Sequence, residues 1–571
     1  MLNAKFRKLI KDPNLFFSDM VKNKKRKINS VQIKKEEGHY QYTVVSAVYN
    51  VGKYLDDFFK SIINQKLDFK KHIFLIMVDD GSHDDSAEII NRWKSKYPNN
   101  VKYIRQDNAG QSSARNTGLE YVTTEWVTFI DPDDFLNIDY FSSIDKNLFL
   151  NRDKKINLIS CNIVMYLESK KIYRDNHPLN YKFSKGNNLV DINKADSEIQ
   201  LSASSAFFKY SVIKEEEISF DGRVKPNFED AHFISKYLLN IEDGFILFMK
   251  DAEYLYRKRE DGTSTLDTSW TKSERFLSVP VFGYLDTLKM YQDSYGHVPT
   301  NIQKTIIYEA LWYLKHLDNR PERTYFLDDT EKEFFINKMK EIFSYIDDDM
   351  IMNFNLAGVW FYHKLAMMSC FKNTLPKFQI AYVDRYDAAK ELIRVRYFSN
   401  NGYFDQFIID GLDTIPVYEK TTPHDFVGEQ LVLERWAWIS VHKAVKIEIK
   451  INNVDTSISC CGKQYKGTIL VANLIDSLKK QIPKFPGKRK YDNSWVLMDR
   501  DMQADDNAEH LYRFIRENHP EQKVFFALRK ESHDWDRLKS DDFNLLDFDS
   551  SEHRLALGSC KKVISSHANF M

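Results

Sequence analysis

Trp126-Val127-Thr128-Phe129-Ile130-Asp131-Pro132-Asp133-Asp134 is the most informative segment of the chain, because an apolar strand ends there in a cluster of carboxylates. Open α/β sheets bind their ligands beyond the carboxyl ends of parallel strands. Asp131 and Asp133 are placed to share one divalent cation, Mg²⁺ or Mn²⁺, whose coordination the phosphate oxygens of a nucleotide complete. A solvated acidic turn is the alternative, and the sequence upstream decides between the two interpretations.

The upstream sequence alternates between strand-like and helix-like segments. Strands are expected over residues 43–50, 73–79 and 101–104, and helices over residues 54–63 and 114–122, with a further helix around Trp93. This alternation predicts a mostly parallel sheet. Asp79 and Asp80 end the second strand, so acidic residues reach one edge of the sheet from two strands. That convergence favours a ligand site over a solvated turn.

Four motifs in this region together resemble the GT-A fold of family 2 glycosyltransferases, over roughly residues 42–270. They are Ala47-Val48-Tyr49-Asn50, Val78-Asp79-Asp80-Gly81-Ser82, Gly110-Gln111-Ser112-Ser113-Ala114-Arg115-Asn116-Thr117-Gly118 and Asp131-Pro132-Asp133-Asp134. The resemblance implies a nucleotide-binding α/β domain that transfers a sugar from a nucleotide-sugar donor, typically with inversion at the sugar C1.

The resemblance also implies roles for individual residues. Ala47, Tyr49 and Asp80 would hold the base of the nucleotide sugar, Arg115 would approach the nucleotide or diphosphate, Asp131 would contact the ribose or a metal-bound water, and Asp133 would bind the metal. The chemistry needs such groups because the departing nucleoside diphosphate carries negative charge away from the sugar. A metal ion and a cationic side chain stabilise that charge.

A base for the acceptor hydroxyl is expected at the start of a helix near residue 229. Family 2 enzymes often carry a Glu-Asp pair there, so the resemblance makes Asp230 the base and Glu229 a residue that orients it or contacts the acceptor. The alternative is a helix N-terminus that simply favours acidic residues. Farther along, Arg257 and Arg259 are predicted to contact the diphosphate, and a solvated basic strand end is the alternative for this pair.

Composition sets limits on the function. The 571-residue chain has 82 basic and 82 acidic residues, so its net charge is zero and a globally nucleic-acid-binding surface is not expected. The five cysteines show no metal-ligand spacing, which indicates reduced thiols in a cytoplasmic protein. The sequence contains neither a signal peptide nor an apolar run of membrane-spanning length.

The first 35 residues break this charge balance, with eleven Lys or Arg residues against two Asp residues. Apolar residues at helical spacing accompany them, so residues 1–37 are predicted to form a basic amphipathic segment that contacts an anionic membrane surface. A solvated linker and a helix docked on the protein are the alternatives. Membrane contact would place the protein peripherally on the inner face of the cell membrane.

Downstream of the GT-A domain, assigned to residues 38–272, three more parts are expected. They are a helical region over 273–375, a β-rich connecting domain over 376–485 and an α/β unit over 486–571. The last unit resembles the start of CDP-glycerol glycerophosphotransferases, which are teichoic-acid-polymerase-like GT-B enzymes. The residues that carry the resemblance are Asp506-Asn507, Leu511-Tyr512 and Ser565-Ser566-His567.

The C-terminal resemblance covers only about 80 residues and lacks the second, CDP-binding Rossmann half of a GT-B enzyme. We therefore expect a truncated part of a two-enzyme capsule polymerase, with glycerophosphotransferase activity only in a longer chain. For His567 a structural role is favoured over a catalytic one.

Together, these features predict a metal-dependent enzyme that moves a hexose from a UDP-hexose to a lipid-anchored, glycerol-phosphate-terminated glycan. A nucleotidyltransferase is one alternative, but residues 47–54 lack the glycine-rich, arginine-containing phosphate loop of that class. A non-catalytic glycan-binding scaffold is the other. The presence of Asp80, Asp131, Asp133 and Asp230 together argues against a scaffold.

Overall fold

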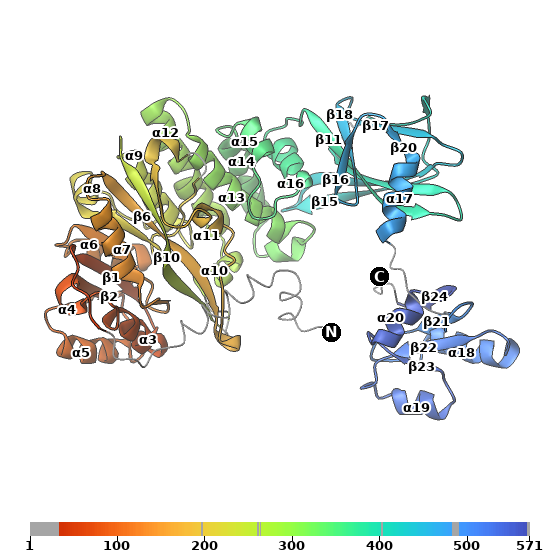
Figure 1. Ribbon diagram of the computed structural model, residues 1–571, viewed down its shortest axis with the longest axis horizontal. Coiled ribbons are helices and arrows are strands. Elements are labelled where there is room, and N and C mark those ends of the chain that lie inside the picture. The colour runs from red at the N-terminus through yellow and green to blue at the C-terminus, as the bar shows by residue number, and fades with distance from the viewer. Residues whose placement is uncertain are drawn as a thin grey trace.

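The computed structural model describes residues 34–195, 198–259, 262, 264–400, 404–481 and 490–567. Figure 1 shows four parts in chain order: a large sheet flanked by helices, a group of helices, a β-rich region and a small α/β unit. This arrangement confirms the fold class predicted from the sequence. The predicted amphipathic segment falls almost entirely outside the described residues, so its membrane contact stays a prediction.

The order of the first strands in the large sheet creates a ligand-binding edge. The strands β1 (Tyr42–Val48), β2 (Ile73–Asp79), β3 (Val101–Arg105) and β4 (Trp126–Phe129) are parallel and lie in the order β3-β2-β1-β4. The chain therefore moves outward from β1 to β3 and returns across β1 to form β4. Open α/β sheets bind ligands where the strand order reverses in this way. Here that point lies beyond the ends of β1 and β4.

The sheet continues past β4 with mixed directions. Antiparallel β9 (Ala206–Lys209) separates β4 from β6 (Ile156–Leu167), and β6 runs parallel to β10 (Phe245–Lys258). Three short strands complete the sheet: β5 (Phe135–Leu136) and β8 (Asn188–Asp191) pair with β10, and β7 (Ile172–Arg174) pairs with β6. The long β10 therefore links the turn after β4 to the chain that enters the helical region.

Alternating side chains of β1 enter two separate cores, one on each face of the sheet. Val44 packs with α3 (Gly52–Ile63) and α7 (Tyr140–Leu150), whereas Val45 packs with α6 (Gln111–Leu119) and α9 (Glu229–Leu239). Successive side chains of a strand point to opposite faces. The nearly unbroken apolar run of β1 is therefore what a strand covered on both sides requires.

The helices that follow the large sheet do not have a core of their own. They are α11 (Glu274–Ser278), η5 (Val279–Leu285), α12 (Asp286–Tyr295), α13 (Thr300–Leu317), α14 (Asp329–Phe343), α15 (Asp348–Asn353), α16 (Phe361–Ala366) and η7 (Met367–Phe371). Their apolar cluster includes Phe228 and Ala231 beside the large sheet, and Phe426 and Val432 of the β-rich region. The helical region therefore joins its two neighbours through one continuous core.

The β-rich region contains two sheets. One has the order β15-β16-β12-β11-β18-β19 and the other the order β14-β13-β17-β20. Their strands are β11 (Phe378–Asp387), β12 (Leu392–Ser399), β13 (Asp405–Ile409), β14 (Leu412–Asp413), β15 (Tyr418–Phe426), β16 (Glu429–Ser440), β17 (Lys446–Ile451), β18 (Asp455–Cys460), β19 (Lys463–Lys466) and β20 (Ile469–Leu470).

A helix occupies the end of the segment that was predicted to be β-rich, residues 376–485. The last strand, β20, spans only Ile469–Leu470, and α17 (Val471–Gln481) begins directly after it. Val471, Leu474 and Leu478 are buried in the core of the region. This spacing of three and four residues matches one face of a helix, so tertiary packing selects the helix.

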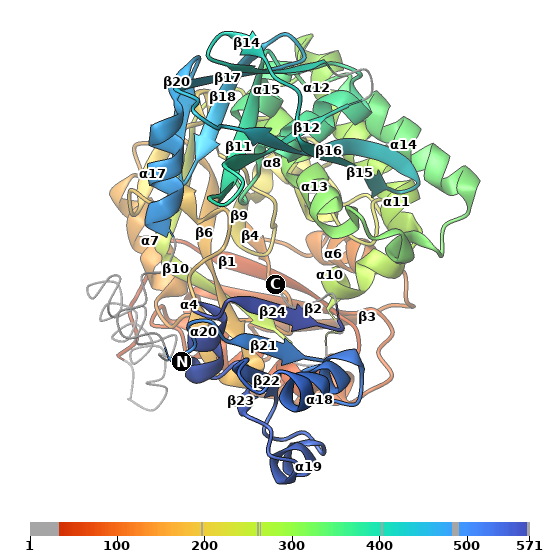
Figure 2. The same cartoon turned by 90° about the vertical axis from the view of Figure 1, so that its right-hand side faces the viewer.

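The C-terminal unit is a parallel sheet in the order β23-β22-β21-β24 (Figure 2). Its strands are β21 (Trp495–Met498), β22 (Val524–Leu528), β23 (Leu545–Asp547) and β24 (Lys562–Ser565), and its helices are α18 (Asn507–Asn518), α19 (Trp535–Ser540) and α20 (Ser551–Leu557). The buried carboxylate of Asp499 accepts hydrogen bonds from the backbone of Ala508 and Glu509 and from the Ser566 hydroxyl. One of the motif residues, Ser566, therefore helps to fix the start of α18.

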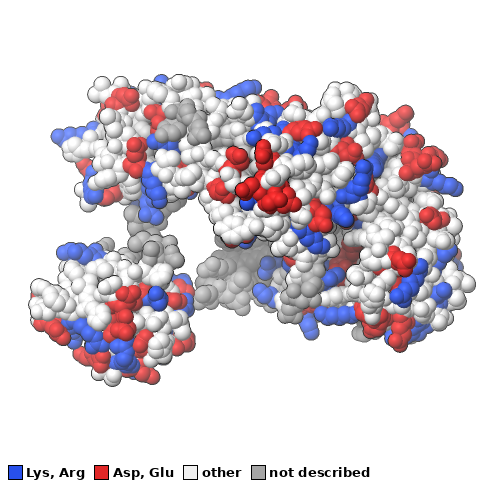
Figure 3. Space-filling view, turned by 180° about the vertical axis from the view of Figure 1, so that it is seen from behind, with Lys and Arg blue, Asp and Glu red and all other residues white. Residues whose placement is uncertain are grey.

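Figure 3 shows Lys and Arg side chains interspersed with Asp and Glu side chains over one face of the molecule. Among the described residues, no helix combines the length and the apolar character that crossing a bilayer requires.

Candidate active site

The buried side chain of Arg115 joins the acidic motifs of the large domain. It extends from α6 with only 2% of its surface exposed. One guanidinium nitrogen, Nη2, lies 2.9 Å from Oδ1 of Asp131, and the other, Nη1, forms a short ion pair with Asp230. The Glu229 carboxylate lies 3.8 Å from Nη1. Residues from α6, the turn after β4 and the start of α9 thus meet at one point.

The charges of this group are partly shielded from water. Because a buried charge is costly unless it is compensated, the position of Arg115 depends on its carboxylate partners. Burial opposes the charged guanidinium, yet the carboxylates of Asp230, Asp131 and Glu229 raise the pKa of Arg115 above its ordinary value. The arginine is therefore a fixed cation at the site.

Burial changes the titration of the surrounding acids. It raises the pKa of Asp131 to about 6, although the Arg115 guanidinium acts in the opposite direction. Burial and the neighbouring Asp230 carboxylate raise the pKa of Glu229 to about 8. At neutral pH Glu229 therefore holds its proton. A neutral acid beside an ion pair can donate a hydrogen bond, which a carboxylate is unable to do.

Asp230 is held in place by two different groups. One carboxylate oxygen pairs with Arg115, and the other accepts a 2.8 Å hydrogen bond from the backbone N–H of Ala203. The preceding residue, Phe228, has a left-handed backbone with φ of 76°, which is unusual for an aromatic residue. Its ring packs edge-on against Tyr284 of the helical region, with centroids 4.6 Å apart. The helical region therefore supports the turn that presents Glu229 and Asp230.

Asp133 and Asp134 have different environments although they are adjacent. The Oδ2 atom of Asp133 pairs with Arg259, at 2.6 Å from Nη2 and 2.8 Å from Nε. Asp134 is buried and accepts hydrogen bonds from the Tyr254 hydroxyl at 2.6 Å and the Arg257 backbone N–H at 2.7 Å. Burial raises its pKa well above the ordinary value. Asp134 therefore fastens the turn to β10, whereas Asp133 pairs with Arg259 and keeps 16% of its side-chain surface exposed.

Arg257 is occupied by protein groups. Its Nε donates to the Asp133 carbonyl at 2.8 Å, and its terminal nitrogens pair with Glu168 at 3.2 Å and Asp57 at 3.1 Å. Its guanidinium also lies 5.1 Å from the centroid of the Tyr54 ring. These contacts give Arg257 a role in holding the turn after β4. The diphosphate contacts of Arg257 and Arg259 stay predictions.

The turns after β1, β2 and β3 also meet at this edge of the sheet. Asp80 is buried, and its carboxylate accepts hydrogen bonds from Gln106 Nε2 at 2.8 Å and from the backbone N–H groups of Ala109 at 2.9 Å and Gly110 at 2.8 Å. Ala47 is half-buried at the end of β1, and Tyr49 is 47% exposed in the turn that follows. The three residues predicted to hold the nucleotide base therefore lie at the same edge of the sheet.

Gly81 explains the shape of the second turn. It has φ of +79°, a conformation that L side chains rarely adopt. A Cβ atom there would also lie 3.1 Å from the backbone nitrogen of Asn108. Glycine at this position lets the turn that contains Asp80 approach the turn after β3 closely.

The predicted metal site depends on the carboxylate oxygens of Asp131 and Asp133. Within the described ranges, no group of three or more His, Cys, Asp or Glu side chains is arranged to hold a metal ion. Among the described residues, Arg115 contacts Asp131 through its Oδ1 atom, and Arg259 contacts Asp133 through its Oδ2 atom. One oxygen of each acid is left for a cation. Two carboxylates completed by phosphate oxygens are a normal environment for Mg²⁺, so the residues fit the ion.

Comparison with known proteins identifies the large domain. Residues 43–195 match the family model described as "Glycosyl transferase family 2". This part of the chain is a family 2 glycosyltransferase domain. The match covers β1 to β4, with their turns, and Arg115, but it ends before Glu229 and Asp230.

Two proteins of Bacillus subtilis (strain 168) are similar over longer stretches. The minor teichoic acid biosynthesis protein GgaB is 25% identical over 93% of this chain and 67% of its own length. The minor teichoic acid biosynthesis protein GgaA is 28% identical over 54% of this chain and 68% of its own length. Among solved structures, S. aureus TarS 1–349 in complex with UDP-GlcNAc has 17% identity and a TM-score of 0.43. It covers 58% of this chain and 87% of the TarS chain.

Sequence reasoning missed several residues that shape the site. Ala203, Phe228 and Tyr254 hold the acidic residues through backbone or packing contacts, and no local motif marks them. The pairing of Arg115 with Asp230 joins residues 115 positions apart. The Gly110–Gly118 motif and the Glu229-Asp230 pair each gave a sequence signal, but each pointed to a separate segment.

Proposed function

We propose that the family 2 domain transfers a hexose from a UDP-hexose to a glycerol-phosphate-terminated glycan, with inversion, in the synthesis of a teichoic-acid-like polymer. The observation that carries the proposal is the meeting of Asp131, Asp230 and Arg115 near the carboxyl ends of the neighbouring strands β1 and β4. The similarity to the minor teichoic acid biosynthesis proteins GgaB and GgaA supports the choice of polymer.

In the proposed reaction, an acceptor hydroxyl oxygen forms a bond to the sugar C1. The bond between C1 and the diphosphate oxygen breaks, and its electron pair leaves with the nucleoside diphosphate. The hydroxyl proton passes to Asp230. The Ala203 N–H and Arg115 hold the two oxygens of that carboxylate, so its orientation is set before the substrates bind. A positioned base of this kind contributes a factor of roughly 10²–10⁴ to the rate.

Glu229 and the arginines have supporting roles in this proposal. A protonated Glu229 donates a hydrogen bond to the acceptor or to Asp230, which suits its raised pKa. Asp131 and Asp133 would hold Mg²⁺ or Mn²⁺, and the ion would supply charge stabilisation for the departing diphosphate. In this proposal Arg259, which pairs with Asp133, contacts the same diphosphate.

Ala47, Tyr49 and Asp80 are proposed to bind the nucleotide base. A carboxylate can accept about four hydrogen bonds, and the turn after β3 uses three of those at Asp80. One position is left for a base N–H group. The exposed ring of Tyr49 offers a face on which a base can stack.

Replacing Asp230 by asparagine tests the proposal because the side chain keeps its shape and loses its basicity. We expect sugar transfer to fall by roughly 10²–10⁴, while UDP still binds in an equilibrium titration. Asp243→Asn is the matched control, because Asp243 lies at the surface of the same domain and pairs with Lys155. Normal turnover by Asp230→Asn would end the assignment of the base.

A further inference from the structure

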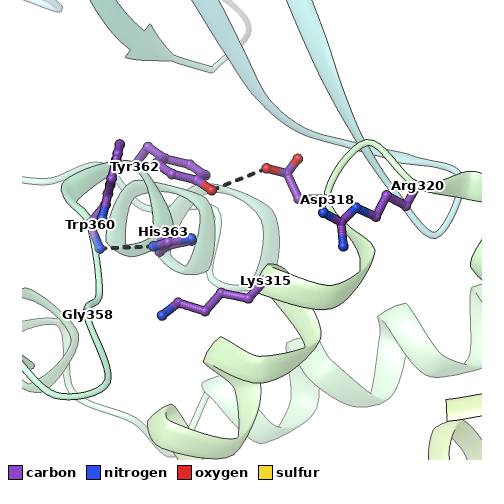
Figure 4. Close-up of a pocket in the computed structure, with 7 residues that line it drawn as sticks. All are labelled: Lys315, Asp318, Arg320, Gly358, Trp360, Tyr362 and His363. Atoms are coloured by element: carbon purple, nitrogen blue, oxygen red, sulfur yellow. Dashed lines mark hydrogen bonds between the residues drawn. The ribbon is translucent and has the colours of Figure 1, made fainter. Parts of the chain in front are cut away.

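A cleft of about 290 Å³ lies where the helical region meets the β-rich region, and it shares no lining residue with the candidate active site. Figure 4 shows Lys315, Asp318 and Arg320 on one side, from the end of α13 and the segment before η6 (Pro321–Thr324). The opposite side comes from Gly358 and from the start of α16. The volume is at the lower end of the range for ligand pockets, which suits a single sugar or phosphate unit.

The cleft carries two cationic side chains. The Lys315 ammonium donates a hydrogen bond to the Ala357 carbonyl and lies 3.7 Å from the point where a Cβ of Gly358 would be. Glycine at 358 therefore leaves the ammonium accessible from the cleft. Arg320 is exposed, and its guanidinium has no hydrogen bond or ion pair with the part of the chain that the structure describes. An unpaired guanidinium is well suited to bind a phosphate through two hydrogen bonds.

The one acid of the cleft is already compensated. Asp318 accepts hydrogen bonds from His424 Nδ1 at 2.9 Å and from the Tyr362 hydroxyl at 3.3 Å. Burial works against a charged His424, but its hydrogen bonds to Asp318 and Glu434 raise its pKa to about 9. His424 is therefore a cation at neutral pH, and its charge balances that of Asp318. The cleft is left with the two positive charges of Lys315 and Arg320.

The wall opposite Arg320 is aromatic and rich in hydrogen-bond donors. Trp360 is 59% exposed, and Tyr362 is fixed by stacking on Phe398, with centroids 5.0 Å apart. Nδ1 of His363 accepts the Trp360 backbone N–H at 2.9 Å, and burial lowers its pKa to about 4. The neutral imidazole therefore carries its proton on Nε2, where it is a donor. An exposed indole gives the apolar face of a pyranose ring a surface on which to pack.

The cleft combines two cations, several hydrogen-bond donors and an exposed indole. We therefore infer that it binds a sugar–phosphate unit of the acceptor polymer. Neither a neutral glycan nor inorganic phosphate would use all of these groups. The identification of the unit as part of the acceptor rests on the proposed function. A free sugar phosphate has the same chemistry, and the experiment below separates the two sources.

A direct structural connection joins the cleft to the catalytic domain. The ring of Trp270 stacks on His316 with centroids 3.9 Å apart, and His316 follows Lys315 in α13. Trp270 lies eleven residues after Arg259, which pairs with Asp133 at the candidate active site. A long acceptor bound at both places would reach the catalytic residues at a raised effective concentration. A short acceptor would gain nothing from the cleft.

The test compares acceptors of two lengths with the full chain. For the double variant Arg320→Ala/Trp360→Ala, we expect the KM for a long acceptor of alternating hexose and glycerol phosphate units to rise at least about tenfold, with kcat unchanged. Values for a short acceptor with a single glycerol phosphate should equal those of the wild type. The matched control is Lys377→Ala/Tyr325→Ala, which removes an exposed cation and an exposed ring from outside the cleft.

Equal KM values for the long acceptor in the double variant and its control would overturn the inference and leave the proposed function intact. If neither acceptor is a substrate, the proposed function fails, and binding of fluorescently labelled polymer to the protein decides the inference by itself. Weaker polymer binding in the double variant alone would support the cleft, and equal binding would refute it. Hexose 1-phosphate and unlabelled polymer would also be compared as competitors of the labelled polymer at equal phosphate concentration. Equal competition by the two would contradict an acceptor site.

Discussion

Removal of the Arg115 guanidinium should destabilise the family 2 domain strongly at neutral pH. The Arg115→Met variant keeps much of the volume of the side chain and leaves Asp131 and Asp230 without their cation. Loss of one partner from a buried ion pair typically costs about 3–5 kcal/mol. Arg115 is 2% exposed, but its partners keep 18% to 30% of their side-chain surface, so the lower end, about 3 kcal/mol, is expected.

The assay is thermal unfolding followed by circular dichroism. A change of 1 kcal/mol shifts the midpoint of a domain of this size by about 2–4 °C, so a decrease of about 6–12 °C is expected. The double variant Arg115→Met/Asp230→Asn should regain part of this loss because it removes one uncompensated acid. A thermodynamic cycle with the two single variants then isolates the coupling between the residues.

The surface pair between Arg223 and Asp221 supplies the control. Its closest atoms are 2.6 Å apart, but the arginine side chain is 62% exposed. Exposed pairs contribute about 0–1 kcal/mol, so Arg223→Met should shift the midpoint by no more than a few degrees. Equal shifts for Arg115→Met and Arg223→Met, or a coupling below about 0.5 kcal/mol between Arg115 and Asp230, would refute the buried ion pair.

Two further predictions concern the neighbouring acids. The pKa of Glu229 is raised from 4.5 to about 8 by burial and by Asp230, so its contribution to stability is complete below pH 4.5 and is lost as the pH rises to about 8. Between about pH 5 and pH 8, the melting temperature of wild type should therefore fall more than that of Glu229→Gln, and parallel curves would contradict the raised pKa. Tyr254→Phe removes the hydroxyl that donates to buried Asp134 and should cost about 1–3 kcal/mol in the same unfolding assay. Tyr121→Phe at an exposed position should have no effect, and an equally stable Tyr254→Phe would contradict the role of Asp134.

The sequence was sufficient to predict the parallel strands because local signals agreed with the global fold. The run from Thr43 to Asn50 was expected as a strand, and β1 spans Tyr42–Val48. The helix expected over 54–63 begins two residues earlier, at Gly52. Such segments are long, periodic and bounded by turn residues, so their type depends little on distant contacts.

The sequence did not predict the different environments of the three acids after β4. Asp131, Asp133 and Asp134 are the same residue type, but Asp134 is buried against Tyr254, which is 120 residues away. Arg257 and Arg259 were predicted to act alike, yet Arg257 pairs with Glu168 and Asp57, whereas Arg259 pairs with Asp133. These differences arise from tertiary packing between segments distant in sequence, for which local periodicity carries no information.

Nucleotide-dependent unfolding of this chain and of Asp133→Ala is the most direct test of the central claim. Thermal unfolding would be measured with UDP, CDP and GDP, each with and without Mn²⁺, and with Asp139→Ala as a surface control in the same domain. A ligand at 100 times its Kd stabilises its domain by about 2.7 kcal/mol. Of the three nucleotides, we predict that only UDP stabilises the wild type and the control, and that it does so only with Mn²⁺. Asp133→Ala should lose this effect. Stabilisation by CDP alone, or by no nucleotide, would contradict a UDP-sugar site in the family 2 domain.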